Sequence, residues 1–342
     1  MTEPAASGTD ALWAGVDRVI DRAWSLDDLQ SHRLQLLAAR RWRQCGRELP
    51  SRLRSQEHTA TVLSLLSPYV LARARAAYDG TIVLMKGPEV GARYPDPILR
   101  PYCDLDLLVD DAPAAQRAFL AAGFTTLGED AAYEGRHHLC PLRAPDVPLK
   151  VEVHRRIEWP KWGPPPDTEE LLASAVPSAI GVDGLLALRP DHHALALAAH
   201  SWSGAPLRRI LDLVDIAAVT EDLDRRAVAA IARGWGIEGV WRTMIDAADA
   251  LLLEVPGARV PPWARDIRDV RDSTVFENHL ARLLGPLWAL PLHRGLHVAV
   301  RAVADDLRPT VGESWAVKRG RARRAVLHPT TPLAEHHAVE AQ

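Results

Sequence analysis

Cysteine is scarce in this chain, which has only Cys45, Cys103 and Cys140 among its 342 residues. Because the three lie far apart, they form neither a disulfide framework nor a closely spaced set of zinc ligands. Long apolar runs are also missing, since no uninterrupted stretch approaches the ~20 residues that cross a bilayer. The first ten residues lack the basic and apolar blocks of a secretory signal. These absences predict a reduced, cytoplasmic protein without a membrane partner.

An excess of charge of either sign is absent as well. The 41 lysine and arginine residues nearly balance the 44 acidic residues, which gives a net charge of −3 at pH 7. Such a balance does not favour a nucleic-acid partner, although a local basic patch is compatible with it. With 47% hydrophobic and 25% charged residues, the chain has a globular composition, and its length suggests about two domains.

Apolar spacing divides the first half of the chain into a helical segment and a mixed core. Helical periodicity runs through the segment 1–78, in helices near 10–20, 29–42 and 60–77. Short apolar runs with turn signals then predict an α/β core over 79–158. Its expected elements are a strand at 81–85, a short helix at 88–94, a Pro-rich loop at 95–101, a strand at 104–109, a helix at 113–122, strands at 124–127 and 149–154, and a strand or loop at 133–140.

The second half is expected to be largely helical. A Pro-rich stretch at 159–168 cannot continue a regular element, so a linker or excursion is predicted over 159–185. A helical C-terminal domain is predicted over 186–315, and a basic, flexible tail over 316–342. The predicted helices of this domain span 191–202, 207–219, 225–234 and 240–253. The predicted fold class is therefore α/β of the α+β kind, with a small mixed-sheet core between helical segments.

Two stretches of the core carry polar residues where chemistry is expected. The first apolar strand ends in Lys86-Gly87, a turn at which glycine lets the backbone approach a ligand closely. The strand at 104–109 follows, with Asp104 and Asp106 on one face. Because side chains alternate along a strand, its leucine and valine neighbours take the opposite face and pack.

A third carboxylate lies on the strand at 149–154. Lys150, Glu152 and His154 share one face of that strand. If the two strands are neighbours, Asp104, Asp106 and Glu152 converge, and they repel one another unless a cation lies between them. Oxygen ligation suits Mg²⁺ better than zinc, and Mg²⁺ completes its shell with waters and substrate phosphates. The pattern predicts metal-dependent chemistry at phosphorus.

Several short motifs follow one another at defined spacings. They are Lys86-Gly87, Tyr94-Pro-Asp-Pro97 with Arg100-Pro101, Asp104 to Val109, Val151-Glu-Val-His154, and Arg208 with Asp212 after His200-Ser-Trp202. In this order they resemble the nucleotidyltransferase superfamily related to DNA polymerase β, and within it the bacterial group described as uncharacterised nucleotidyltransferase. The resemblance covers roughly residues 80–215, and it depends on the ordered set rather than on any single motif.

The resemblance implies roles for individual residues. Asp104, Asp106 and Glu152 would ligate Mg²⁺ and carry the catalysis. Lys86 and the Gly87 amide would face the triphosphate. Arg100, Arg208 and Asp212 would belong to the nucleotide-binding site.

The resemblance also implies a reaction. A nucleoside monophosphate would move from an NTP, with ATP as the expected donor, to a hydroxyl or phosphate of a small-molecule or peptide acceptor. The wider superfamily has Gly-Ser at the turn where this chain has Lys86-Gly87. A different grip on the phosphates, and even a different direction of transfer, is therefore compatible with the sequence.

Two further functions stay open at this point. Kinase-like transfer of the terminal phosphoryl group to a peptide or natural product uses the same fold and releases ADP instead of pyrophosphate. A non-catalytic NTP-binding or toxin–antitoxin partner protein would bind nucleotide without turnover. The three intact carboxylates argue against this last function.

Several polar residues also have plain structural interpretations. Arg208 and Asp212 fit an i,i+4 ion pair on a helix, and Arg100 could orient an aspartate as well as neutralise phosphate. His137 and His138 would point in opposite directions on a strand, so at most one is expected to line the site. His193 and His200 lie two helical turns apart, about 10 Å, which favours packing or capping roles.

Overall fold

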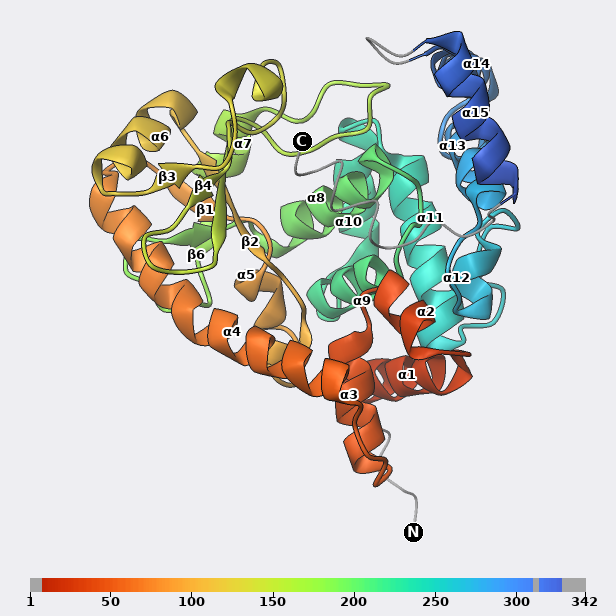
Figure 1. Ribbon diagram of the computed structural model, residues 1–342, viewed down its shortest axis with the longest axis horizontal. Coiled ribbons are helices and arrows are strands. Elements are labelled where there is room, and N and C mark those ends of the chain that lie inside the picture. The colour runs from red at the N-terminus through yellow and green to blue at the C-terminus, as the bar shows by residue number, and fades with distance from the viewer. Residues whose placement is uncertain (1–7, 310–313, 328–342) are drawn as a thin grey trace.

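The computed structural model describes residues 8–309 and 314–327. It has a mixed α/β architecture in which one seven-stranded sheet lies among many helices (Figure 1). This confirms the predicted α+β class. In the described part of the chain, no helix has both the length and the apolar composition of a membrane span.

The N-terminal segment is helical, but its last helix is longer than predicted. Its helices are α1 (Gly8–Arg22), α2 (Leu26–Ser31), α3 (Gln35–Gln44) and α4 (Ser51–Ala77). The polar stretch at 48–56 was expected to separate helices, yet α4 begins at Ser51, directly after Pro50. It also continues through Pro68, where Ser67 Oγ donates to the Leu63 carbonyl oxygen at 2.7 Å. Packing of the apolar face of α4 outweighs the local cost of an internal proline.

The sheet has the strand order β3-β4-β5-β2-β1-β7-β6. At its centre, β2 (Asp104–Val109) pairs antiparallel with β1 (Ile82–Leu84) and parallel with β5 (Lys150–His154). The remaining strands have two residues each: β3 (Thr125–Thr126), β4 (Leu142–Arg143), β6 (Val176–Pro177) and β7 (Leu186–Ala187). The range 159–185, predicted as a linker, contains α7 (Thr168–Ala173) and β6.

Short helices connect the central strands. They are α5 (Pro88–Gly91), the 3₁₀ turn η1 (Pro97–Leu99), α6 (Ala112–Ala121) and the 3₁₀ turn η2 (Asp130–Tyr133). Most of the segment 133–140, left open between strand and loop, is irregular, and it pairs with β5 through a single bridge between His138 and His154.

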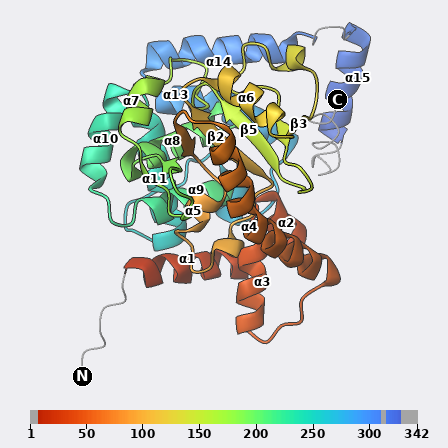
Figure 2. The same cartoon turned by 90° about the vertical axis from the view of Figure 1, so that its left-hand side faces the viewer.

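Each face of the sheet packs against its own hydrophobic core. Leu105, Leu107 and Val109 of β2 pack with α4 and α6 on one face, and α4 runs along that side of the molecule in Figures 1 and 2. Leu108 belongs to the second core, which includes α8 (Pro190–Ser203) and α9 (Ile210–Val219). The alternation of β2 therefore turns its aspartates towards the C-terminal helices.

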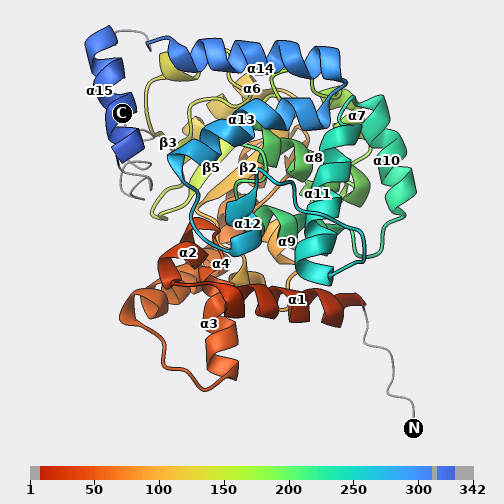
Figure 3. The same cartoon turned by 90° about the vertical axis from the view of Figure 1, so that its right-hand side faces the viewer.

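The remaining helices build the other half of the molecule. They are α10 (Arg225–Gly234), α11 (Glu238–Ala248) with the π turn η3 (Asp249–Leu253), α12 (Arg265–Asp269), α13 (Val275–Ala289), α14 (Leu292–Leu307) and α15 (Trp315–Leu327). Figure 3 shows α13 to α15 on one side of the molecule. The basic run at 318–324, expected in a flexible tail, lies in α15, and residues 328–342 of that prediction lie outside the described residues.

A buried ion pair joins the loop before β2 to α9. The Arg100 guanidinium donates to both carboxylate oxygens of Asp215, at 2.9 and 2.7 Å, and Tyr94 Oη donates to the same carboxylate at 2.6 Å. Arg100 Nη1 also donates to the Gly87 carbonyl oxygen at 3.4 Å. Because both charges are buried, each depends on the other for compensation.

We expect Asp215→Ala to lower the free energy of unfolding by about 3–5 kcal/mol, because it leaves a buried guanidinium without its partner. Urea denaturation followed by circular dichroism measures the change. Glu238→Ala, which removes one partner of the exposed Arg233–Glu238 pair, is the control and should leave the unfolding midpoint unchanged. Equal midpoints for both variants would show that the buried pair does not stabilise the fold.

Candidate active site

The turn after β1 places a lysine beside helix α8. Gly87 has φ 62° and ψ −123°, a conformation that L side chains rarely adopt, and a Cβ there would meet the Asp104 carbonyl oxygen at 3.3 Å. Glycine therefore permits the close approach of this turn to β2. The preceding Lys86 directs its ammonium to His200, with Nζ 2.8 Å from Nδ1.

The parallel pairing of β2 with β5 brings remote carboxylates together. Its register places Asp104 opposite Lys150 and Asp106 opposite Glu152. The predicted convergence of three carboxylates required β2 and β5 to be neighbours, and they are. Directly paired residues on one face of a sheet lie close enough for their side chains to interact.

Lys150 lies between two of these carboxylates. Its Nζ is 2.7 Å from Glu152 Oε1 and 3.5 Å from Asp104 Oδ2. Burial, followed by the charges of Asp106 and Glu152, raises the pKa of Asp104. The ammonium of Lys150 opposes that shift and takes the position of a cation between the acidic groups.

His154 neutralises the deeper carboxylates from the end of β5. Its Nε2 is 2.9 Å from Asp106 Oδ1 and 3.6 Å from Glu152 Oε2. Burial opposes its charge, but the hydrogen bonds to both carboxylates raise the pKa of His154 to about 9. Burial would raise the pKa of Asp106, yet Lys86 and then His154 outweigh it and hold that pKa below its usual range.

The donor set fits a divalent cation. One ligand atom each from Asp106, Glu152 and His154 lies within 4.8 Å of the others. Burial disfavours the charge of Glu152, but the hydrogen bond from His154 and further charges lower its pKa to about 2, so the group is ionised for binding. Asp104 lies on the same face and stays a predicted ligand, although it is outside this compact set. Two carboxylates suit Mg²⁺, and the imidazole suits a role that orients Asp106.

Both histidines before β4 lie beside the acidic cluster. His138 Nε2 is 3.9 Å from Glu152 Oε2, and the His137 ring centroid is 5.3 Å from that of His154. The expectation that at most one of them faces the site is wrong, because this segment is not a regular strand and its side chains need not alternate.

A second polar cluster, formed by Glu158, His200 and Ser203, lies beside Lys86. Glu158 Oε2 lies 2.6 Å from His200 Nδ1, and Glu158 Oε1 accepts a hydrogen bond from Ser203 Oγ at 2.5 Å. His200 was expected to pack or cap, but its side chain is 36% exposed and polar groups contact it. His193 does have a structural role, since its Nε2 contacts the Met85 carbonyl oxygen at 2.6 Å.

The three other predicted nucleotide-binding residues lie outside this cluster. The Arg100 guanidinium is committed to Asp215 and to the Gly87 carbonyl oxygen. The prediction of a helical ion pair between Arg208 and Asp212 is wrong. Helix α9 begins only at Ile210, and no such pair occurs among the described residues. Arg208 is exposed before the helix, and Asp212 accepts from Ser201 Oγ at 3.0 Å.

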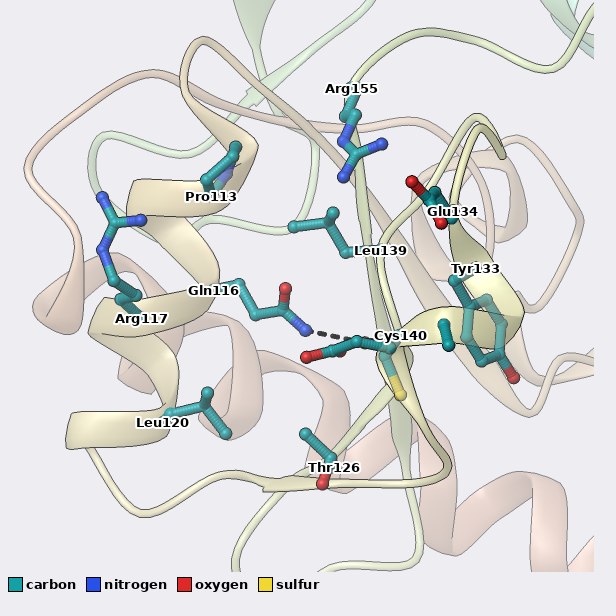
Figure 4. Close-up of a pocket in the computed structure, with 12 residues that line it drawn as sticks. Pro113, Gln116, Arg117, Leu120, Thr126, Tyr133, Glu134, Leu139, Cys140 and Arg155 are labelled. Carbon is teal, nitrogen blue, oxygen red and sulfur yellow. Dashed lines mark hydrogen bonds between the residues drawn. The ribbon is translucent and has the colours of Figure 1, made fainter.

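A cavity of about 460 Å³ lies on the α6 side of the sheet. Its lining includes Gln116, Tyr133, Leu139 and Arg155, which surround the space in Figure 4. None of the predicted site residues lines it. Its lining residue Tyr133 has its ring centroid 5.4 Å from that of His138.

The sequence placed Lys150 and His154 on the strand face of Glu152, but it did not predict that their charges compensate the carboxylates. For Glu158 and His200 no local signal exists. Their meeting depends on how α8 docks against the segment after β5.

The fold and this acidic face define a class of protein. A mixed sheet presents clustered carboxylates and an adjacent lysine turn beneath a helical half, which is a nucleotidyltransferase-like arrangement. A model of the family described as uncharacterised nucleotidyltransferase matches residues 20–252, well over half of the chain. The chain therefore belongs to this family, which supports a transferase of that general kind. No curated protein and no solved structure matches it.

The position of Lys150 predicts competition with metal. Because its ammonium lies between Asp104 and Glu152, it would compete with a cation held by these carboxylates. We expect Lys150→Met to bind Mn²⁺, a spectroscopic substitute for Mg²⁺, more tightly than the wild type, as measured by electron paramagnetic resonance. The equally cationic but exposed Lys161 provides a control, since Lys161→Met should leave Mn²⁺ affinity unchanged. Weaker binding by Lys150→Met would contradict competition.

The raised pKa of His154 predicts a pH effect on stability. The group titrates near 6.5 when unfolded and at about 9 when folded, so its stabilisation is complete below pH 6.5 and is lost as the pH rises through 9. We expect the metal-free protein to lose more stability between pH 6.5 and 9 than His154→Gln does, as measured by urea denaturation in EDTA. Parallel pH profiles for the two proteins would exclude a charged His154.

Proposed function

We propose that this protein is a Mg²⁺-dependent nucleotidyltransferase. It moves a nucleoside monophosphate from an NTP, with ATP as the expected donor, to a hydroxyl or phosphate of a small-molecule or peptide acceptor. The three cysteines are free, which supports a reducing, cytoplasmic location. Membership of the nucleotidyltransferase family supports the reaction class.

One observation carries the proposal. Asp106 and Glu152 are directly paired across adjacent parallel strands, and the charge of Lys86 helps to lower the pKa of Asp106. One or two carboxylates commonly hold Mg²⁺ together with substrate phosphates, and a lysine ammonium supplies a positive charge for the phosphates. Their combination on one face of a family member supports phosphorus as the reacting centre.

Each residue then has a defined task. Asp104, Asp106 and Glu152 would hold the cation, which when bound neutralises charge on the triphosphate and on the leaving pyrophosphate. Lys86 would turn from His200 to the phosphates, and Gly87 leaves room for them beside the turn. Catalysis by these residues consists of positioning and charge stabilisation.

Arg100, Arg208 and Asp212 would each contribute to the nucleotide-binding site in a different way. Arg100 would act indirectly, because it anchors the Gly87 carbonyl oxygen and α9 together. The exposed guanidinium of Arg208 is available to an anionic ligand. Asp212 would position the end of α8 through Ser201.

The products distinguish nucleotidyl from phosphoryl transfer. Transfer of a nucleoside monophosphate releases pyrophosphate, whereas kinase-like transfer releases ADP. Incubation of the protein with ATP and Mg²⁺, against a panel of hydroxyl compounds and peptides, should yield pyrophosphate. ADP as the only product would replace the proposal by its kinase-like alternative.

Removing a metal-binding charge tests the site itself. We expect Asp106→Asn to reduce Mg²⁺-dependent pyrophosphate release by at least about 100-fold, because the neutral amide ligates a divalent cation poorly. Asp183→Asn, at an exposed carboxylate between β6 and β7, is the matched control and should retain full activity. Full activity of Asp106→Asn with an intact circular dichroism spectrum would disprove the assignment.

A further inference from the structure

Glu158, His200 and Ser203 form a short hydrogen-bonded chain beside Lys86. Ser203 Oγ donates to one oxygen of Glu158, and the other oxygen lies 2.6 Å from His200 Nδ1. Burial would raise the pKa of Glu158, but His200 and Ser203 hold it well below its usual range, so the group is a carboxylate. A carboxylate on Nδ1 orients an imidazole and selects its tautomer.

Two groups compete for the same ring nitrogen. Lys86 Nζ lies 2.8 Å from His200 Nδ1, on which Glu158 also converges. Nδ1 of a neutral imidazole either donates or accepts, so it serves the carboxylate or the ammonium but not both. If Lys86 leaves for a phosphate, Nδ1–H bonds to Glu158, and Nε2 keeps a free lone pair.

The other ring nitrogen is open to a ligand. Among the residues that the structure describes, no hydrogen bond or ion pair involves His200 Nε2. The side chain is 36% exposed, in contrast to the buried His193 two turns earlier in α8. His137 links this chain to the carboxylate cluster, because its Nε2 lies 3.8 Å from Glu158 Oε2 and its ring centroid is 5.3 Å from that of His154.

We infer that His200 is the general base of this enzyme and that the acceptor group is a neutral hydroxyl. The inference rests on the proposed nucleotidyl transfer. The acceptor O–H bond breaks and its proton passes to His200 Nε2. The oxygen forms a bond to the α-phosphorus, and the bond from that phosphorus to pyrophosphate breaks. A phosphate acceptor is already an anion at neutral pH, so it needs no base and would be repelled by Glu158.

The arrangement also couples the base to the nucleotide. While Lys86 holds Nδ1, the remaining proton of a neutral ring lies on Nε2, which then cannot accept a proton. Binding of a triphosphate draws Lys86 away, and the bond to Glu158 moves the free lone pair to Nε2. The base is thus available only when the donor is bound. Glu158 and Ser203 are positioning residues in this scheme.

The tautomer of His200 is directly measurable without turnover. We expect the ¹⁵N-histidine spectrum with Mg²⁺ and α,β-methylene-ATP, which cannot release pyrophosphate, to show His200 with a protonated Nδ1 and an unprotonated Nε2. The signal is assigned by its loss in His200→Ala, and Glu158→Gln should shift it towards the Nε2–H form. A wild-type His200 protonated on Nε2 in the presence of the analogue would overturn the inference.

Chemical rescue separates a base from a structural histidine. With MgATP and with water as the acceptor probe, His200→Ala should lower pyrophosphate release by about 100-fold or more, and free imidazole should restore part of it. His58→Ala, at an exposed histidine of α4, is the control, with unchanged activity and no response to imidazole. A fully active His200→Ala, or a loss that imidazole does not relieve, would refute the base.

The same assays separate failure of the inference from failure of the proposed function. If Asp106→Asn abolishes pyrophosphate release while His200→Ala does not change it, the transferase assignment stands and only the base is wrong. If the wild type releases no pyrophosphate with any acceptor, the proposed nucleotidyl transfer itself fails. The tautomer measurement then reports independently on the competition between Lys86 and Glu158.

Discussion

Mutual repulsion of carboxylates on one half-buried sheet face is the constraint on which this structure depends. Asp106 and Glu152 are directly paired, with Asp104 two residues away, and burial makes each isolated negative charge costly. The chain compensates with Lys150 and His154 from the neighbouring strand. Acids and cations therefore come from the same strand pair, so the negative charges are compensated within the sheet itself.

The helical half is joined to this sheet by polar contacts as well as by the apolar core. The buried pair of Arg100 with Asp215 connects the loop before β2 to α9, and Tyr94 shares the same carboxylate. Arg100, a predicted nucleotide-binding residue, therefore has its guanidinium bound to Asp215. Arg100 Nη1 also donates to the Gly87 carbonyl oxygen, which ties this ion pair to the turn after β1. On the other side of this turn, Lys86 reaches His200.

Much of the core could be predicted because it depends on local patterns. The strand at 104–109 was predicted with its observed bounds, and its alternation placed Leu105, Leu107 and Val109 in the core. Helix ends were less predictable, as in α4, where tertiary packing outweighed a polar stretch and an internal proline. The two-residue strand β6 is too short for any periodic signal, so its place at the sheet edge was invisible.

By itself, the sequence determined which residues share a strand face, since period-two alternation follows from backbone geometry. It therefore placed Asp104 with Asp106, and Glu152 with Lys150 and His154. Only the tertiary structure decided that these two strands are parallel neighbours in a register that opposes Asp106 to Glu152. It alone also brought His200 and Glu158 to Lys86. Contacts between residues far apart in the chain depend on how whole elements pack, and no local pattern records that.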